Sequence, residues 1–312
     1  MTTYRPERTE HRPAHGGGGG ATGREPGAAR HARRPSPEPS IPAVRPQNVH
    51  SFLVDCLTMT QRNLLTILRV PQLLLGATVQ PLMFVLLFSY VFGGALGGPT
   101  YREFLMGGIF TQTVVFSAAF TAIGLATDSK EGIVDRFHSL PMSRVSIVLG
   151  RTLSDTLVSV VSIAVMIAAG YAVGWRIRSS VLDALGAVLL LMFFGFAISW
   201  LGAVVGLVAG TAESAQSALM IVLFPITFIS SAFIPSSTLP GPLRAFAQWN
   251  PITSTARSTR EAFGNPVAPS PAIREPVNWA SMHPTAYSIV VSILVLAVLV
   301  PVALRVSRSS DG

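Results

Sequence analysis

The sequence predicts an all-α membrane protein, a bundle of six transmembrane helices preceded by an amphipathic helix in the membrane interface. Hydrophobic residues make up 49% of the 312 residues and charged residues only 12%, whereas soluble domains contain about 25% charged residues. Six apolar stretches, uncharged at their centres, each have about the length that a helix needs to cross a bilayer. None of them alternates apolar and polar residues as a membrane β-strand does, so we expect helices throughout.

The N-terminal segment, residues 1–47, is rich in glycine, proline, arginine and glutamate and contains five consecutive glycines at 16–20. Such a segment buries too little apolar surface to offset the entropy cost of ordering. We therefore expect a disordered tail, followed by a membrane domain over residues 48–308.

An amphipathic helix is expected directly after the tail, because apolar residues recur there at helical spacing. Polar residues such as Asp55 and Arg62 lie mostly off this stripe, which favours a helix lying in the interface. Pro71 then permits a sharp turn into the bilayer. The stripe consists of Val49, Phe52, Leu53, Cys56, Leu57, Leu64, Ile67 and Leu68.

The six spans are expected at about residues 70–92, 104–126, 152–175, 184–210, 217–235 and 286–305. An even number of spans places both termini on one side of the membrane. Arg62 and Arg69 precede the first span and Arg102 follows it, which favours a cytoplasmic N-terminus because positive residues tend to stay inside. We expect a multi-pass protein of the plasma membrane with both termini in the cytoplasm.

The connection between spans five and six, from Pro235 to Pro284, is the longest. Its first half has two short apolar faces separated by Asn250-Pro251, which predict two short helices at the interface or dipping into it. The faces consist of Leu243, Phe246 and Ala247, and then Ile252, Ala256, Thr259 and Phe263.

Several kinds of site are absent from the sequence. A Walker loop needs Gly-x4-Gly-Lys-Ser/Thr, but the single lysine, Lys130, is followed by Glu131. The single cysteine, Cys56, excludes an internal disulfide and multi-cysteine metal sites. We therefore expect no enzyme activity, no catalytic residue and no cofactor or metal in this chain. Nucleic acid is disfavoured as a partner, because basic residues are not interleaved with aromatic ones.

The spans carry no charged residue near their middle. Proton-coupled transporters usually bury Asp, Glu or His at that depth, because the coupling chemistry needs it. Ion-driven transport is therefore disfavoured, and the energy for any transport should come from elsewhere. An uncharged path suits hydrophobic or amphipathic compounds better than ions or sugars.

Uncharged polar residues inside the first two spans have two interpretations. Gln80 lies in the first span, and Gln112 and Thr113 lie in the second. They form hydrogen bonds between helices, or they line a substrate path.

Two further features also remain open. Gly202, Gly206 and Gly210 form a stripe on the fourth span, which indicates close helix packing or a contact that slides during gating. Arg151 and Asp155 form a weak pair at a helix end or a latch between the third span and the preceding loop.

A charged segment, residues 128–144, lies between two apolar stretches and must therefore lie outside the lipid. Its apolar residues Ile133, Val134, Phe137 and Leu140 fit one side of a short helix that ends at Pro141. The segment is a solvated loop, or it is an amphipathic helix on which another protein acts.

Two motifs resemble a known family. The run Glu131-Gly-Ile-Val-Asp-Arg-Phe-His-Ser-Leu-Pro-Met-Ser-Arg144, followed by Leu149-Gly-Arg151, resembles the cytoplasmic loop of type-2 ABC exporter permeases. It is especially similar to the daunorubicin/doxorubicin resistance permease group of actinobacteria. Ile229-Ser-Ser-Ala-Phe-Ile-Pro235, Leu239-Pro-Gly-Pro-Leu-Arg-Ala-Phe-Ala247 and Asn250-Pro-Ile-Thr253 resemble the family's segment between spans five and six. The resemblance covers about residues 48–305 and excludes the tail.

The resemblance implies partners and residue roles. It implies two copies of a separate ABC ATPase, which bind ATP and Mg, and a second permease subunit that forms a homodimer or a pseudo-dimer with this chain. It implies a coupling helix that docks on the ATPase, made of Glu131, Gly132, Ile133, Val134, Asp135, Arg136, Phe137, Leu140 and Pro141. It also implies re-entrant helices that close the extracellular side, with gate residues Pro240, Leu243, Phe246, Trp249, Pro251 and Phe263.

The sequence thus favours the membrane subunit of an ATP-driven exporter of hydrophobic or amphipathic compounds such as drugs or antibiotics. Two alternatives remain open at this point. One is an exporter of a polysaccharide or a lipid-linked glycan. The other is a membrane immunity or sensor protein that sequesters a toxin without turnover.

Overall fold

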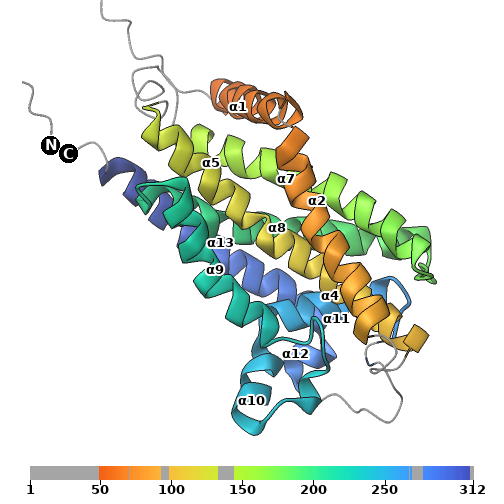
Figure 1. Ribbon diagram of the computed structural model, residues 1–312. Coiled ribbons are helices and arrows are strands. Elements are labelled where there is room, and N and C mark those ends of the chain that lie inside the picture. The colour runs from red at the N-terminus through yellow and green to blue at the C-terminus, as the bar shows by residue number, and fades with distance from the viewer. Residues whose placement is uncertain are drawn as a thin grey trace, which may run out of the picture. The chain divides into compact units, whose positions relative to one another are not determined.

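Every regular element in the described part of the chain is a helix. The computed structural model describes residues 49–69, 71–92, 98–132, 144–266, 268 and 277–309, all within the unit Val44–Gly312 (Figure 1). No strand occurs in these residues. The all-α fold class is therefore confirmed for them. Most of the predicted coupling helix, residues 133–141, lies outside the described residues.

The helices follow one another along the chain in the expected order. They are α1 (Val49–Arg69), α2 (Pro71–Leu86), the π-helix η1 (Leu87–Phe92), α4 (Gly98–Phe116), α5 (Ala118–Lys130), α7 (Arg144–Ala172), α8 (Val181–Val208), α9 (Ala212–Phe228), the 3-10 helix η2 (Ser236–Thr238), α10 (Gly241–Trp249), α11 (Pro251–Ala262), α12 (Trp279–Met282) and α13 (Pro284–Ser309).

Within the described ranges, four helices are long and apolar enough to cross a membrane. They are Gly98–Lys130, Val145–Ala172, Val181–Val208 and Pro284–Ser307. Two shorter apolar helices, Thr78–Val91 and Ala212–Phe228, lie where the first and fifth spans were predicted. A set of four to six apolar helices without strands is typical of a multi-pass membrane protein.

The fifth apolar helix ends earlier than the sequence pattern suggests. α9 stops at Phe228, whereas the apolar stretch continues to residue 235. The side chain of Asn250 donates hydrogen bonds to the carbonyl oxygens of Ile226, at 2.7 Å, and of Ile229, at 3.0 Å. These bonds satisfy carbonyls that a continuing helix would use, so the chain turns away at this point.

The tightest helix packing in the core joins α5 to α8. A Cβ atom added to Gly202 would lie 2.1 Å from the carbonyl oxygen of Ala118, and one added to Gly206 would lie 2.5 Å from that of Ala122. Gly210 has no atom of another element within 4 Å. The packing interpretation of the glycine stripe is therefore confirmed for its first two members.

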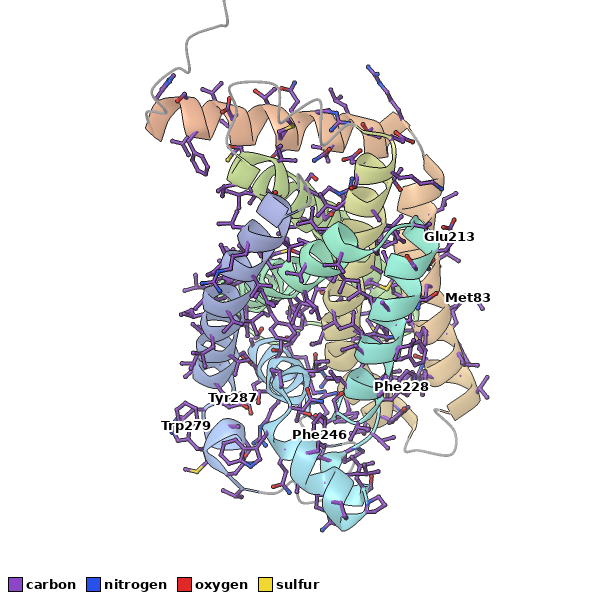
Figure 2. All side chains as sticks on the ribbon, turned by 90° about the vertical axis from the view of Figure 1, so that its left-hand side faces the viewer. Met83, Glu213, Phe228, Phe246, Trp279 and Tyr287 are labelled. Carbon is purple, nitrogen blue, oxygen red and sulfur yellow. The ribbon has the colours of Figure 1, made fainter. Side chains whose placement is uncertain are left out.

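Helix α1 and helices α10 and α12 lie at opposite ends of the described unit (Figures 1 and 2). α1 runs across the end of the bundle and packs on α7. Its packed face is not the whole predicted stripe: Cys56 and Met59 are buried, whereas Leu53 and Leu57 are 54% and 67% exposed. α1 thus has one apolar face buried against the protein and a second one exposed, which fits a helix that lies between the bundle and the membrane interface.

Candidate functional site

Two adjoining cavities penetrate the bundle. The larger has a volume of about 370 Å³ and lies between α1, α5, α7 and the end of α4. The smaller has a volume of about 70 Å³ and lies between α2, the α4–α5 region and α9. Thr113, Ser117, Phe120 and Ile123 line both cavities, so these four residues form their common wall.

The three residues predicted to line a substrate path meet at the smaller cavity. Gln80, Gln112 and Thr113 all line it, although they come from two different helices. The Thr113 hydroxyl donates to the carbonyl oxygen of Ile109 at 2.8 Å. Gln112 is only 3% exposed, and its amide oxygen accepts no hydrogen bond from any described residue. Gln112 therefore retains unused hydrogen-bonding capacity, and the role of the three residues in a substrate path stays a prediction.

The larger cavity contains two ion pairs. Arg62 on α1 reaches Asp128 on α5 at 3.7 Å. Arg151 and Asp155, both on α7, approach to 3.1 Å, and Asp155 also accepts a hydrogen bond from the Thr121 hydroxyl at 2.7 Å. The second pair is therefore more than a helix-end contact, because it joins α7 to α5 inside the protein. The predicted latch to the preceding loop stays a prediction, because residues 133–143 of that loop lie outside the described residues.

Glycines allow this arrangement. A Cβ atom on Gly124 would lie 2.0 Å from Cζ of Arg151, so the guanidinium occupies the space that glycine leaves. Arg151 donates from Nη2 to the carbonyl oxygen of Phe120 at 3.0 Å. A Cβ atom on Gly150 would lie 2.4 Å from Cβ of Met59, so that glycine admits α1. The Leu149-Gly-Arg151 motif thus positions α1 and α5 against α7.

Arg260 on α11 is a buried cation that the sequence interpretation missed. It is 1% exposed and donates from Nε to the carbonyl oxygen of Phe104 at 2.6 Å and from Nη2 to that of Ser231 at 2.7 Å. Its guanidinium lies 3.7 Å from the centroid of the Phe104 ring. Its spacing could have revealed it, because Arg260 follows Ala256 by four residues and shares its apolar face.

The six predicted gate residues differ in their burial and in their positions on the helices. Leu243, Phe246 and Trp249 on α10 are 40%, 50% and 53% exposed. Phe263 is instead buried, and its ring packs against those of Phe110 and Trp175. The two proline positions lie at helix starts: Pro240 precedes α10, and Pro251 begins α11.

Aromatic residues from two helices meet beside α10, at the end of the unit opposite α1 (Figure 2). The Tyr287 hydroxyl donates to the carbonyl oxygen of Trp249 at 2.6 Å. Trp279 lies with its ring 6.0 Å from that of Tyr287. Large exposed aromatic side chains of this kind are typical of membrane interfaces.

Two residues of the predicted coupling helix are described. Glu131 caps the end of α5 and lines the larger cavity. Gly132 follows with a φ of 65°, which few residues other than glycine adopt. Ile133, Val134, Asp135, Arg136, Phe137, Leu140 and Pro141 lie outside the described residues.

Comparison with known proteins connects this architecture to a family. Residues 54–263 match the ABC-2 type transporter family. The chain is 36% identical over 207 residues to the daunorubicin resistance ABC transporter permease protein DrrB1 of Streptomyces coeruleorubidus, which covers 66% of this chain and 73% of that protein.

Two more distant relatives are also named for transport. The probable doxorubicin resistance ABC transporter permease protein DrrC of Mycobacterium tuberculosis is 25% identical over 220 residues, or 69% of this chain and 79% of that protein. The polysialic acid transport protein KpsM of Escherichia coli is 25% identical over 177 residues, or 56% of this chain and 66% of that protein. The family match covers well over half of the chain and contains both cavities, and the chain therefore belongs to the ABC-2 type transporter family.

Proposed function

We propose that this chain is the transmembrane subunit of an ATP-driven exporter that removes hydrophobic or amphipathic compounds, such as drugs or antibiotics, from the cell. The observation that carries the proposal is the pair of adjoining cavities. They lie in a chain that belongs to a family of transport permeases. A permease of this family is a transport component of the membrane and is not itself an enzyme. Its family implies an ABC ATPase as the partner that hydrolyses ATP.

The proposed assembly contains two ATPase copies and a second copy of this permease. Six spans, both termini in the cytoplasm, and re-entrant helices α10 and α11 at the extracellular side belong to this proposal. The basic residues around the first span support the orientation. The position of α10 and α11, at the end of the bundle opposite α1, supports their proposed role at the extracellular gate (Figure 1).

Helix α5 is the proposed mechanical link. It ends at Lys130, directly before the segment that resembles a coupling helix, and its residues Phe120 and Ile123 line both cavities. Force applied to that segment by the ATPase would therefore move the common wall of the cavities. Asp155 would carry the same movement to α7, because it binds Thr121 of α5 and Arg151 of α7.

The similarity to KpsM keeps a glycan exporter as the second candidate. The described lining of the larger cavity holds three carboxylates, from Asp128, Glu131 and Asp155, and two guanidinium groups, from Arg62 and Arg151. This excess of negative charge would repel a polyanionic glycan. Hydrophobic and amphipathic compounds therefore remain the favoured cargo.

Transport by the reconstituted complex tests the proposal. Proteoliposomes with this permease and its co-purified ATPase should take up daunorubicin, the compound named for the relative DrrB1, only when ATP is supplied outside. Uptake should be absent with a non-hydrolysable ATP analogue. Stable binding of the drug without ATP-dependent accumulation would favour the sequestering alternative and overturn the exporter.

A further inference from the structure

We propose that the larger cavity is a binding site for amphipathic organic cations. The proposal rests on the exporter function and specifies both the class of cargo and the place within one protomer where it binds. A volume of about 370 Å³ lies within the range of sites for drug-sized molecules, about 300–1,000 Å³. An apolar wall of Phe120, Ile123 and Val158 would contact the hydrocarbon part of such a molecule.

The hydroxyl groups of the cavity favour a ligand that donates hydrogen bonds. Every serine and threonine that lines the larger cavity already donates its hydroxyl proton to a carbonyl oxygen of its own helix. The six residues are Thr66, Thr113, Ser117, Thr127, Ser159 and Ser162. Each hydroxyl therefore presents lone pairs and no proton to the cavity. Such a surface receives ammonium or hydroxyl donors and offers little to a carboxylate or phosphate.

The charges of the cavity also favour a cationic ligand. Arg151 already contacts Asp155, and Arg62 contacts Asp128. Glu131 adds a third carboxylate at the end of α5. The lining that the structure describes thus carries a formal excess of one negative charge. A cationic head between Asp128 and Glu131 would bring the total charge of the site to neutral.

The smaller cavity extends the site. It shares the Thr113, Ser117, Phe120 and Ile123 wall with the larger cavity, and Gln112 lines it with unused hydrogen-bonding capacity. A buried polar group without a hydrogen-bond partner is costly, so a guest that bonds to the Gln112 amide would gain affinity. Movement of the common wall would let the ligand pass from the α1 side toward α2 and α9.

Two dyes with the same ring system test the charge preference. The purified permease, in lipid nanodiscs and without its ATPase, is titrated into rhodamine 123, a cation with amino donors, and into fluorescein, an anion. Fluorescence polarisation should show saturable binding of rhodamine 123, with fluorescein bound at least about tenfold more weakly. Equal binding of the two dyes, or no binding of rhodamine 123 to folded protein, would overturn the proposal.

Two isosteric variants with matched controls locate the site. Asp128→Asn should weaken rhodamine 123 binding about tenfold, whereas Glu213→Gln, an exposed carboxylate on α9 (Figure 2), should not change it. Thr113→Val, which removes an acceptor from the cavity, should weaken binding a few-fold. Its control is Thr156→Val, because Thr156 lies outside both cavities and makes the same kind of bond, to the carbonyl oxygen of Thr152 at 2.7 Å.

The outcomes separate this site from the exporter function. If monodisperse Asp128→Asn and Thr113→Val proteins both bind rhodamine 123 as the unchanged chain does, the site is refuted even where the complex still exports daunorubicin. If both variants lose binding while the controls keep it, the site is supported even where no ATPase associates with the chain.

Discussion

Arg260 donates a hydrogen bond from Nε to the carbonyl oxygen of Phe104 at 2.6 Å, across 156 positions of sequence. The same guanidinium donates from Nη2 to the carbonyl oxygens of Ser231 and Ala232, at 2.7 and 3.1 Å. One side chain therefore fastens α11 both to α4 and to the turn after α9. Gly108 permits the close approach, because its Cβ would lie 1.7 Å from the carbonyl oxygen of Ala232.

Replacing Arg260 should destabilise the protein markedly. Arg260→Met removes the guanidinium that donates to the carbonyl oxygens of Phe104, Ser231 and Ala232, and we expect a loss of about 3 kcal/mol. Arg257→Met is the control on the same helix, because Arg257 forms a partly exposed pair with Glu261, worth about 0.3–0.5 kcal/mol. Thermal unfolding in detergent measures both. Equal melting temperatures for the two variants would show that the buried contacts contribute nothing.

A side chain at Gly150 should displace α1. Gly150→Ala places Cβ against Met59, and α1 should move away from α7. Cys56, the single cysteine, reports this movement: it is 5% exposed, and burial raises the pKa of its thiol, which slows labelling by maleimide. Labelling should accelerate about tenfold in the variant, because exposure lowers the pKa and opens access.

Gly186→Ala on α8 is the matched control for this experiment, because a Cβ at Gly186 meets no atom within 4 Å. Its Cys56 labelling rate should equal that of the unchanged chain. Labelling of the unchanged chain should also require a higher pH than a free thiol needs, since the raised pKa leaves less thiolate at any given pH. Fast labelling of the unchanged chain near neutral pH would contradict the docking of α1.

The glycine stripe provides a comparison within one helix and its end. Gly202→Ala forces a methyl group into the carbonyl of Ala118, and overpacking of this kind costs about 1–3 kcal/mol. Gly210→Ala, where nothing lies within 4 Å, should leave stability unchanged or slightly raise it. Unfolding curves of the two variants in detergent measure this difference in stability. A Gly202→Ala protein as stable as Gly210→Ala would mean that α5 and α8 do not pack as closely as described.

The end of α5 should matter for coupling more than for folding. Glu131→Ala or Gly132→Ala should uncouple ATP hydrolysis from efflux while the complex still assembles and remains monodisperse. Gly132 has a φ of 65°, and alanine there costs about 1 kcal/mol of local strain. That strain redirects the chain that enters the proposed coupling helix. Efflux per ATP hydrolysed is the readout, and normal efflux in both variants would defeat the assignment.

Much of this fold could be predicted from sequence periodicity. The apolar helices occur in the predicted order, because a stretch without charge over the thickness of a bilayer has few alternatives to a helix. Gln80, Gln112 and Thr113 could be singled out for the same reason, as polar residues in an apolar setting. The structure places them at one cavity.

Other features depend on contacts that periodicity does not contain. The acceptors of Arg260 are backbone carbonyls, which no residue pattern reveals. Phe263 is buried because Phe110 of α4 and Trp175 of the segment after α7 pack against its ring. α9 ends at Phe228 because Asn250, remote in sequence, bonds to its last carbonyls. The larger cavity likewise combines residues from α1, α5 and α7.

Purification of the tagged chain from mild detergent, together with whatever ATPase it recruits in its native host, tests the central claim most directly. The account predicts that an ABC ATPase co-purifies and turns over ATP, and that both are lost when a glycine-serine linker replaces residues 131–141. A folded chain that purifies alone, without ATP turnover, would contradict the exporter and favour a protein that sequesters its ligand.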